Sequence, residues 1–128
     1  MRFLVRSEKN FMTYLKILHN PRCSKSRQTL QLLQDRGLNP QIIEYLKKPM
    51  NADELTLIIS QLGFSSARQL IRKGEDIYKQ QNLADPTLTE NILINAMLDS
   101  PKLIERPIVL CNGKAAIGRP PESVLDIL

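Results

Sequence analysis

A two-residue turn near the end of the chain is the sequence feature that most restricts its fold. Asn112-Gly113 is the strongest short-range signal for a β-hairpin, and two short apolar runs flank it, Pro107 to Cys111 (PIVLC) and Lys114 to Ile117 (KAAI). Two strands joined by so short a turn are antiparallel neighbours in one sheet. The chain therefore needs a sheet with an antiparallel half.

The other half of the sheet is predicted from a strand, a helix and a strand in the first third of the chain. The β-like run 14–18 (YLKIL) ends at the turn signal Asn20-Pro21, and a helix is expected over 24–36. Gly37 ends that helix, and the next strand is 41–45 (QIIEY). Such a βαβ unit predicts a parallel pair of strands with a right-handed crossover.

A helical segment separates the two halves. Asn51 and Glu54 match a capping box for a helix that stops at Gly63. Further helices are expected from Ser65 or Ser66 through Arg72, over 76–81, over 89–99, and from Pro120 to Leu128. The order β-α-β, helical insertion, β-β-α predicts an α/β fold of thioredoxin type, with one four-stranded mixed sheet and helices on its faces. Ferredoxin-like folds share part of this order.

Length and composition agree with one domain. The chain has 128 residues, of which 12–128 are expected to form a single domain and 1–11 a poorly ordered N-terminal extension. No apolar run approaches the ~18 residues of a membrane span. The first residues lack a secretory h-region, and two cysteines do not make a disulfide framework, so we expect a cytoplasmic protein.

The charge favours a small anion over a large partner. The formal net charge is +5, but aromatic residues are only 5% of the chain, and no basic face interleaved with aromatics is evident. We therefore expect neither a nucleic-acid nor a membrane partner. Two cysteines and one histidine cannot supply a four-ligand zinc site of Cys and His, so no metal is expected.

Cys23 is the candidate nucleophile. It lies in the stretch HNPRCSKSRQTL, at the predicted start of the first helix, where unpaired backbone N–H groups favour a thiolate and also bind oxyanions. His19 would act in the same direction when protonated, although it could equally be a structural hydrogen-bonding group. A buried structural cysteine is the alternative for Cys23. Three basic neighbours favour the thiolate: Arg22, Lys25 and Arg27.

The spacing around Cys23 excludes other thiol and phosphate chemistries. The chain holds no GxxxxGK[ST] loop, and the arginine that a cysteine-based phosphatase loop needs six residues after its cysteine is replaced by Thr29. A C-x-x-C dithiol site is excluded by Ser26. Cys111 lies in an apolar strand and is expected to be structural. Cys23 would therefore work through a mixed disulfide with an outside thiol such as glutathione.

Four blocks spread over residues 14–128 resemble the glutaredoxin- and glutathione-dependent arsenate reductase (ArsC) family: HNPRCSKSRQTL, RKGEDIYKQQNLAD, ERPIVL and IGRPPESVLDIL. The resemblance implies a thioredoxin-like fold and a cytoplasmic oxidoreductase with no bound cofactor. It matches the family's nucleophile to Cys23 and the histidine that lowers its pKa to His19. The oxyanion-binding arginines match Arg72, Arg106 and Arg119, and Arg27 is a further candidate ligand from its place near Cys23. The bond Arg106-Pro107 is expected to be cis.

The resemblance also implies a reaction. The Cys23 thiolate would attack arsenate, glutathione would reduce the resulting ester to arsenite, and glutaredoxin would remove glutathione from Cys23. We expect a monomer with arsenate, glutathione and glutaredoxin as partners. Two alternatives stay open. One is a glutathione-linked thiol transferase without arsenate specificity, and the other is a non-catalytic thioredoxin-like regulatory or interaction protein.

Overall fold

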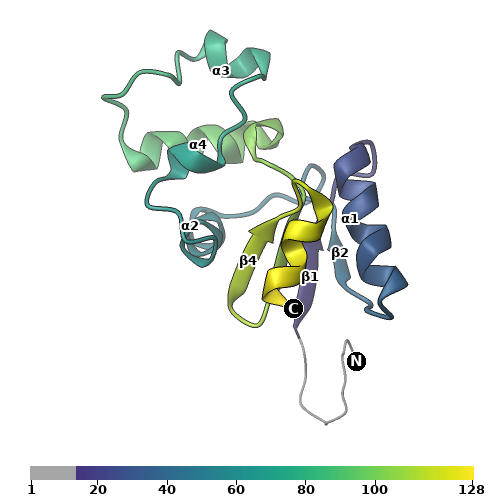
Figure 1. The fold of residues 1–128 in the computed structure, drawn as a ribbon. Coiled ribbons are helices and arrows are strands. Elements are labelled where there is room, and N and C mark those ends of the chain that lie inside the picture. Colours follow the sequence, from purple (N-terminus) through teal and green to yellow (C-terminus); the bar gives the residue numbers. More distant parts are fainter. Residues whose placement is uncertain (1–13) are drawn as a thin grey trace. The chain divides into compact units, whose positions relative to one another are not determined.

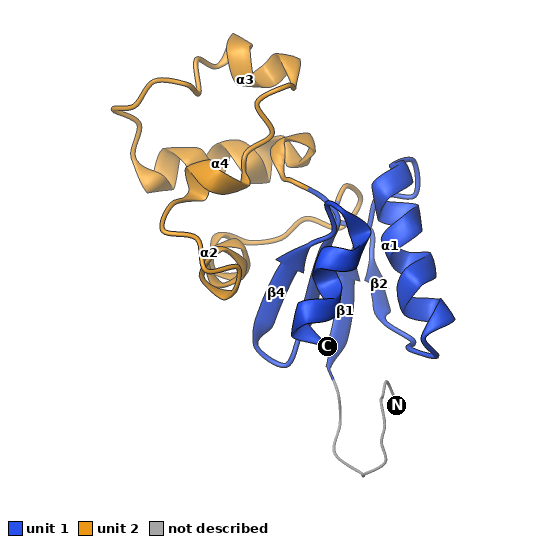
Figure 2. Cartoon of the chain, in the orientation of Figure 1, with its two compact units in different colours: residues 1–45, 106–128 blue, residues 46–105 orange. Residues whose placement is uncertain are grey.

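The computed structural model describes residues 14–128, which form two compact units (Figure 2). The sheet unit consists of residues 14–45 and 106–128, and the helical unit of residues 46–105. The helical unit is the insertion that the sequence predicts between the two halves of the sheet. The expected N-terminal extension, residues 1–11, lies outside the described residues, and the single domain over 12–128 stays a prediction.

One mixed sheet of four strands forms the centre of the sheet unit (Figure 1). Its order is β2-β1-β3-β4. β1 is parallel to β2 and antiparallel to β3, and β3 is antiparallel to β4. The strands are β1 (Leu15–Leu18), β2 (Gln41–Ile43), β3 (Ile108–Cys111) and β4 (Lys114–Ile117). This confirms the predicted α/β fold with a mixed sheet.

The hairpin between β3 and β4 has the geometry that its two turn residues allow. Asn112 has φ of 51° and Gly113 has φ of 85°, the two left-handed positions of a type I′ turn. The turn is also tied to the start of β1, because Asn112 N–H donates to the Tyr14 carbonyl at 3.2 Å and Tyr14 N–H donates to Asn112 Oδ1 at 3.1 Å. The hairpin therefore sets the register of the strand that leads to the cysteine loop.

Two helices pack against the sheet, α1 (Ser24–Asp35) and the 3-10 helix η3 (Pro121–Ile127). The core is a cluster of six buried residues from the strands and both helices: Leu15, Ile17, Leu33, Val109, Cys111 and Val124. The segment between β4 and η3 also lies close to α1, since a Cβ at Gly118 would overlap Thr29 Oγ1 and lie 2.9 Å from Pro107 Cγ. Only glycine fits there without a shift of its neighbours.

The helical unit begins as the capping box predicts. The Asn51 side chain accepts from Glu54 N–H at 2.8 Å, and the Glu54 carboxylate accepts from Asn51 N–H at 3.0 Å. These bonds satisfy backbone donors at the start of α2. The elements of this unit are α2 (Ala52–Gln61), η1 (Ala67–Leu70), α3 (Asp76–Gln80), α4 (Glu90–Asp99) and η2 (Pro101–Leu103).

The helix predicted from Ser65 or Ser66 through Arg72 is wrong in extent and type. Only the short 3-10 helix η1 forms, and the backbone then becomes extended at Ile71. Ile71 pairs with Ile104 in an isolated antiparallel bridge, and both side chains are buried. Arg72 N–H donates to the Leu103 carbonyl at 2.7 Å, so this segment finds its backbone partner far along the chain instead of within a helix.

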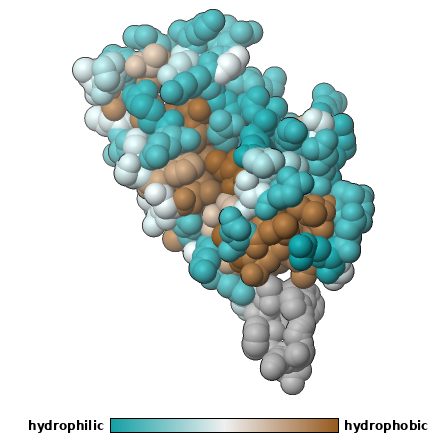
Figure 3. All heavy atoms as spheres, in the orientation of Figure 1, coloured by the Kyte–Doolittle hydropathy of each residue, from teal (hydrophilic) through white to brown (hydrophobic). Residues whose placement is uncertain are grey.

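Hydrophilic side chains cover most of the face in Figure 3, with apolar areas between them. Within residues 14–128, no helix is long and apolar enough to cross a membrane. The large hydrophobic side chains that are exposed are spread along the chain: Tyr14, Ile42, Leu46, Leu57, Ile92 and Leu128.

Candidate active site

Cys23 is the N-cap residue of α1, at the point where the loop after β1 becomes helical. Its backbone is extended, with φ of −96° and ψ of 123°, and its side chain is 8% exposed. The loop is closed by two short-range bonds to Asn20: the carbonyl accepts from Cys23 N–H at 2.9 Å, and Oδ1 accepts from Arg22 N–H at 3.0 Å. The asparagine-proline turn therefore places the thiol at the first turn of the helix, as the sequence predicts.

The surroundings of Cys23 lower the pKa of its thiol. Burial is the largest influence and acts to raise that pKa, but three groups together outweigh it. These are the backbone N–H of Ser26, the guanidinium of Arg106 through a hydrogen bond and its charge, and the backbone N–H of Lys25. The N-terminal N–H groups of α1 and one arginine thus favour the thiolate, which is the nucleophilic form of cysteine.

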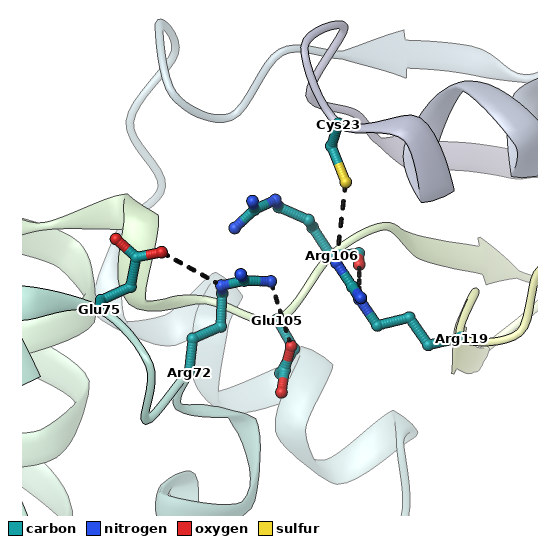
Figure 4. A network of polar contacts seen from close by, with 6 residues as sticks. All are labelled: Cys23, Arg72, Glu75, Glu105, Arg106 and Arg119. Carbon is teal, nitrogen blue, oxygen red and sulfur yellow. Dashed lines mark hydrogen bonds and ion pairs between the residues drawn. The ribbon is translucent and has the colours of Figure 1, made fainter.

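Two arginines that are far from Cys23 in sequence meet beside its sulfur. Arg119 Nη2 donates to Cys23 Sγ at 3.7 Å, and Arg119 Nε donates to the Arg106 carbonyl at 2.8 Å (Figure 4). Both arginines precede cis-prolines, and the bond Arg106-Pro107 is confirmed as cis. Arg106 Nε is buried and has no hydrogen-bond partner among the described residues. The site therefore holds an unused buried N–H donor on the same arginine whose guanidinium lowers the pKa of the Cys23 thiol.

His19 is buried, and its contacts favour the neutral imidazole. Its Nδ1 lies 2.6 Å from Ser26 Oγ, and the same oxygen accepts from Asn20 N–H at 3.0 Å. Burial lowers the pKa of His19 more than the nearby Glu44 carboxylate raises it, and the Arg27 guanidinium lowers it further. These contacts therefore disfavour the protonated imidazole, which was expected to favour the thiolate of Cys23. The role of His19 at the site stays a prediction.

Ser26 is the site residue that sequence reasoning missed. The sequence marked it only as the position where a second cysteine is absent. Its hydroxyl joins His19 to the loop before the helix, while its backbone N–H faces Cys23, and the side chain is fully buried. The available signal was its place three residues after the N-cap, where a backbone N–H of the helix reaches the capping group.

Arg27 and Cys111 do not reach the sulfur through any contact in the described residues. Arg27 is exposed, and its Nη1 donates to the Pro21 carbonyl at 3.0 Å, which ties α1 to the loop before it. Cys111 is buried in β3, where burial raises the pKa of its thiol, in agreement with the structural role expected for it. The part of Arg27 in ligand binding stays a prediction.

Arg72 belongs to the helical unit and is held there by two carboxylates. Its Nε lies 3.5 Å from Glu75 Oε2, and its Nη1 lies 3.6 Å from Glu105 Oε1 (Figure 4). Arg68, four residues earlier in η1, has other partners: its guanidinium donates to the carbonyls of Leu83 at 2.7 Å and Asp85 at 2.8 Å. Arg72 as an oxyanion ligand stays a prediction.

A mixed four-stranded sheet with one activated cysteine at the N-cap of its first helix, near a cis-proline, defines a thioredoxin-like protein with a single reactive thiol. A sequence model of the ArsC family matches residues 18–127, and the chain belongs to this family.

Relatives and solved structures agree with this assignment. The chain is 57% identical over 114 residues to Uncharacterized protein YfgD of Escherichia coli (strain K12), covering 89% of this chain and 96% of that protein. It is 48% identical over 117 residues to Arsenate reductase of Neisseria meningitidis serogroup A, covering 91% of this chain and all of that protein. The structure of Arsenate reductase from Vibrio cholerae superposes with a TM-score of 0.89 at 50% identity, covering 91% of this chain and 98% of that one.

Proposed function

We propose that this protein is an oxidoreductase that reduces arsenate to arsenite, with Cys23 as its nucleophile, glutathione as co-substrate and glutaredoxin as the partner that regenerates the thiol. Membership of the ArsC family and relatives named arsenate reductase at 48% identity support the reaction class. The single observation that carries the mechanism is the activated thiol of Cys23, beside the guanidinium groups of Arg106 and Arg119.

The first step joins sulfur to arsenic. The Cys23 thiolate attacks arsenate, an Sγ–As bond forms, and one arsenate oxygen leaves as water after taking up protons. Negative charge develops on the remaining oxygens, where guanidinium forks and the N–H groups at the start of α1 stabilise it. The unused Nε–H of Arg106 supports this role, because an oxyanion would supply its missing acceptor.

The second step reduces arsenic. A glutathione thiolate attacks Cys23 Sγ, the S–As bond breaks, and its electron pair stays on arsenic, which leaves as arsenite. Cys23 is then disulfide-linked to glutathione. A glutaredoxin thiol takes up that glutathione by a second exchange and returns Cys23 to the thiolate. Ser26 supports the need for an outside thiol, since it occupies the position of the local resolving cysteine in a C-x-x-C site.

The cellular setting and the oligomeric state are part of the proposal. Both described cysteines are free, which suits a reducing compartment, and we place the enzyme in the cytoplasm, where glutathione is reduced. We expect it to act as a monomer, because each group in this mechanism comes from one chain.

A coupled assay tests the proposed reaction. Arsenate-dependent NADPH oxidation is followed with glutathione, glutathione reductase and glutaredoxin present in excess. The wild type should turn over, Cys23→Ser should be inactive, and Cys111→Ser should keep the wild-type rate, because the Cys111 thiol lies in the core with a raised pKa. Full activity in Cys23→Ser, or none in the wild type, would contradict the proposal.

The arginine pair separates arsenate reduction from general thiol transfer. Arg106→Ala with Arg119→Ala should lower kcat/KM for arsenate by at least about 100-fold, because the loss of a single oxyanion donor typically costs about 100- to 1,000-fold. Reduction of a glutathionylated peptide should change much less when both proteins are compared at a pH at which the Cys23 thiol of the variant is also ionised, because Arg106 lowers the pKa of that thiol but the peptide carries no oxyanion. Equal loss on both substrates would favour the thiol transferase instead.

A further inference from the structure

A groove on the sheet unit runs along α1 beside η3 and has no assigned use. Its volume is about 460 Å³, and its lining comes from α1 on one side and from the start of η3 on the other: Lys25, Gln28, Gln31, Leu32, Asp35, Pro120, Pro121 and Glu122. Its lining comes entirely from the sheet unit. A groove of this size is enough for part of a small peptide.

Both sides of the groove include a residue next to the site, although Cys23 itself is not part of the lining. Lys25 lines the groove, and its backbone N–H helps to lower the pKa of Cys23. On the other side, Pro120 directly follows Arg119, whose Nη2 lies 3.7 Å from Cys23 Sγ. A molecule bonded to Cys23 therefore has the groove as a path along the protein surface.

Charges of both signs line this groove. Lys25 contributes an ammonium from α1, and Glu122 contributes a carboxylate from η3. The other carboxylate of the lining, Asp35, already accepts from Gln31 Nε2 at 2.8 Å. Neither Lys25 nor Glu122 takes part in an ion pair within residues 14–128. The amide of Gln28 adds a group that can donate or accept. This set complements a ligand end that carries both a carboxylate and an ammonium.

We propose that the groove binds the γ-glutamyl arm of glutathione, with its α-carboxylate at Lys25 and its α-ammonium at Glu122. The proposal rests on the proposed use of glutathione. The thiol of this tripeptide lies on the middle residue, and the γ-glutamyl arm extends from it by about one residue length, roughly 3.5 Å, plus the side-chain carbons of the glutamate. That arm is the end with both charges, whereas the glycine end carries only a carboxylate.

Thiol–disulfide exchange tests the groove without arsenate. The Cys23 thiolate attacks glutathione disulfide, an Sγ–S bond forms, the S–S bond of the disulfide breaks, and one glutathione thiolate leaves. The rate is compared with that for the disulfide of glutathione acetylated on its α-amino groups, which has lost the ammonium. The wild type should react about two- to fivefold faster with the unmodified disulfide, the range expected for an exposed ionic contact.

The variant Glu122→Gln should remove this preference, while Asp126→Asn should keep it, because Asp126 is an exposed acid on the same helix outside the groove. Absence of a preference in the wild type would overturn the proposal without any variant. A preference that persists in Glu122→Gln, or that Asp126→Asn also removes, would overturn it too. Since no arsenate is present, failure here is distinct from failure of the arsenate reductase assay.

Discussion

Replacing Ser26 with alanine tests whether one buried hydroxyl organises the cysteine loop. Ser26 is fully buried, and its Oγ has two partners, the Asn20 N–H at 3.0 Å and His19 Nδ1 at 2.6 Å. The alanine variant leaves both polar groups without a partner. An unsatisfied buried group costs about 1–3 kcal/mol, and the Asn20 N–H costs less than a fully buried group because it is only part-buried, so we expect a loss of roughly 2–4 kcal/mol in the free energy of unfolding.

The assay is urea denaturation followed by circular dichroism, with Ser24→Ala as the matched control, since Ser24 is an exposed serine at the start of the same helix. The pKa of the Cys23 thiol, read from the pH dependence of iodoacetamide alkylation, should also rise in Ser26→Ala, because the Ser26 N–H that lowers it is then less firmly held. A change below about 0.5 kcal/mol, the usual size of a surface substitution, would refute the reasoning.

Three further predictions follow from buried groups. Burial lowers the pKa of His19 below 6.5, so on acidification the unfolded chain binds a proton before the folded chain does. The free energy of unfolding should therefore fall from about pH 7 to pH 5.5, and it should fall less steeply in His19→Asn. Gly118→Ala should cost about 1–3 kcal/mol, because its Cβ would overlap Thr29 Oγ1. At neutral pH iodoacetamide should label Cys23 and leave Cys111 unmodified, as judged by peptide mass spectrometry.

Each of these predictions has a result that would contradict it. An unchanged slope of stability against pH in His19→Asn would show that the imidazole is not the group responsible. A Cβ at Gly74 would meet no atom within 4 Å, so a loss in Gly74→Ala as large as in Gly118→Ala would deny any special role to the close contact. Faster alkylation of Cys111 than of Cys23 would reverse the assignment of the two thiols.

The strands and most helices could be predicted because their signals are local. The Asn112-Gly113 turn and the Asn51 capping box each depend on residues a few positions apart, and both form as predicted. The helix predicted through Arg72 is wrong because the segment is fixed by a contact that is distant in sequence. Ile71 pairs with Ile104, a partner 33 positions later, and nothing within the segment itself reveals that bridge.

The candidate site also combines features with a local sequence signal and features that depend on the folded chain. The position of Cys23 at a helix start could be predicted from the turn and the helix pattern, and the structure places it there. The protonation of His19 could not, because its pKa depends on burial and on the nearby charges of Glu44 and Arg27 in the folded chain. Arg106 and Arg119 were identified by resemblance alone, since only the fold brings the start of β3 and the end of β4 together beside the sulfur.

The central claim is that Cys23 bonds to arsenate and that an outside thiol, glutathione, supplies the electrons that reduce it to arsenite. The most direct measurement is a single turnover with arsenate and reduced glutathione but without glutaredoxin, followed by intact and peptide mass spectrometry. The account predicts one glutathionyl group on Cys23, formed only when arsenate is present and matched by an equal amount of arsenite. Arsenite without this adduct, or the adduct at the same rate without arsenate, would contradict it.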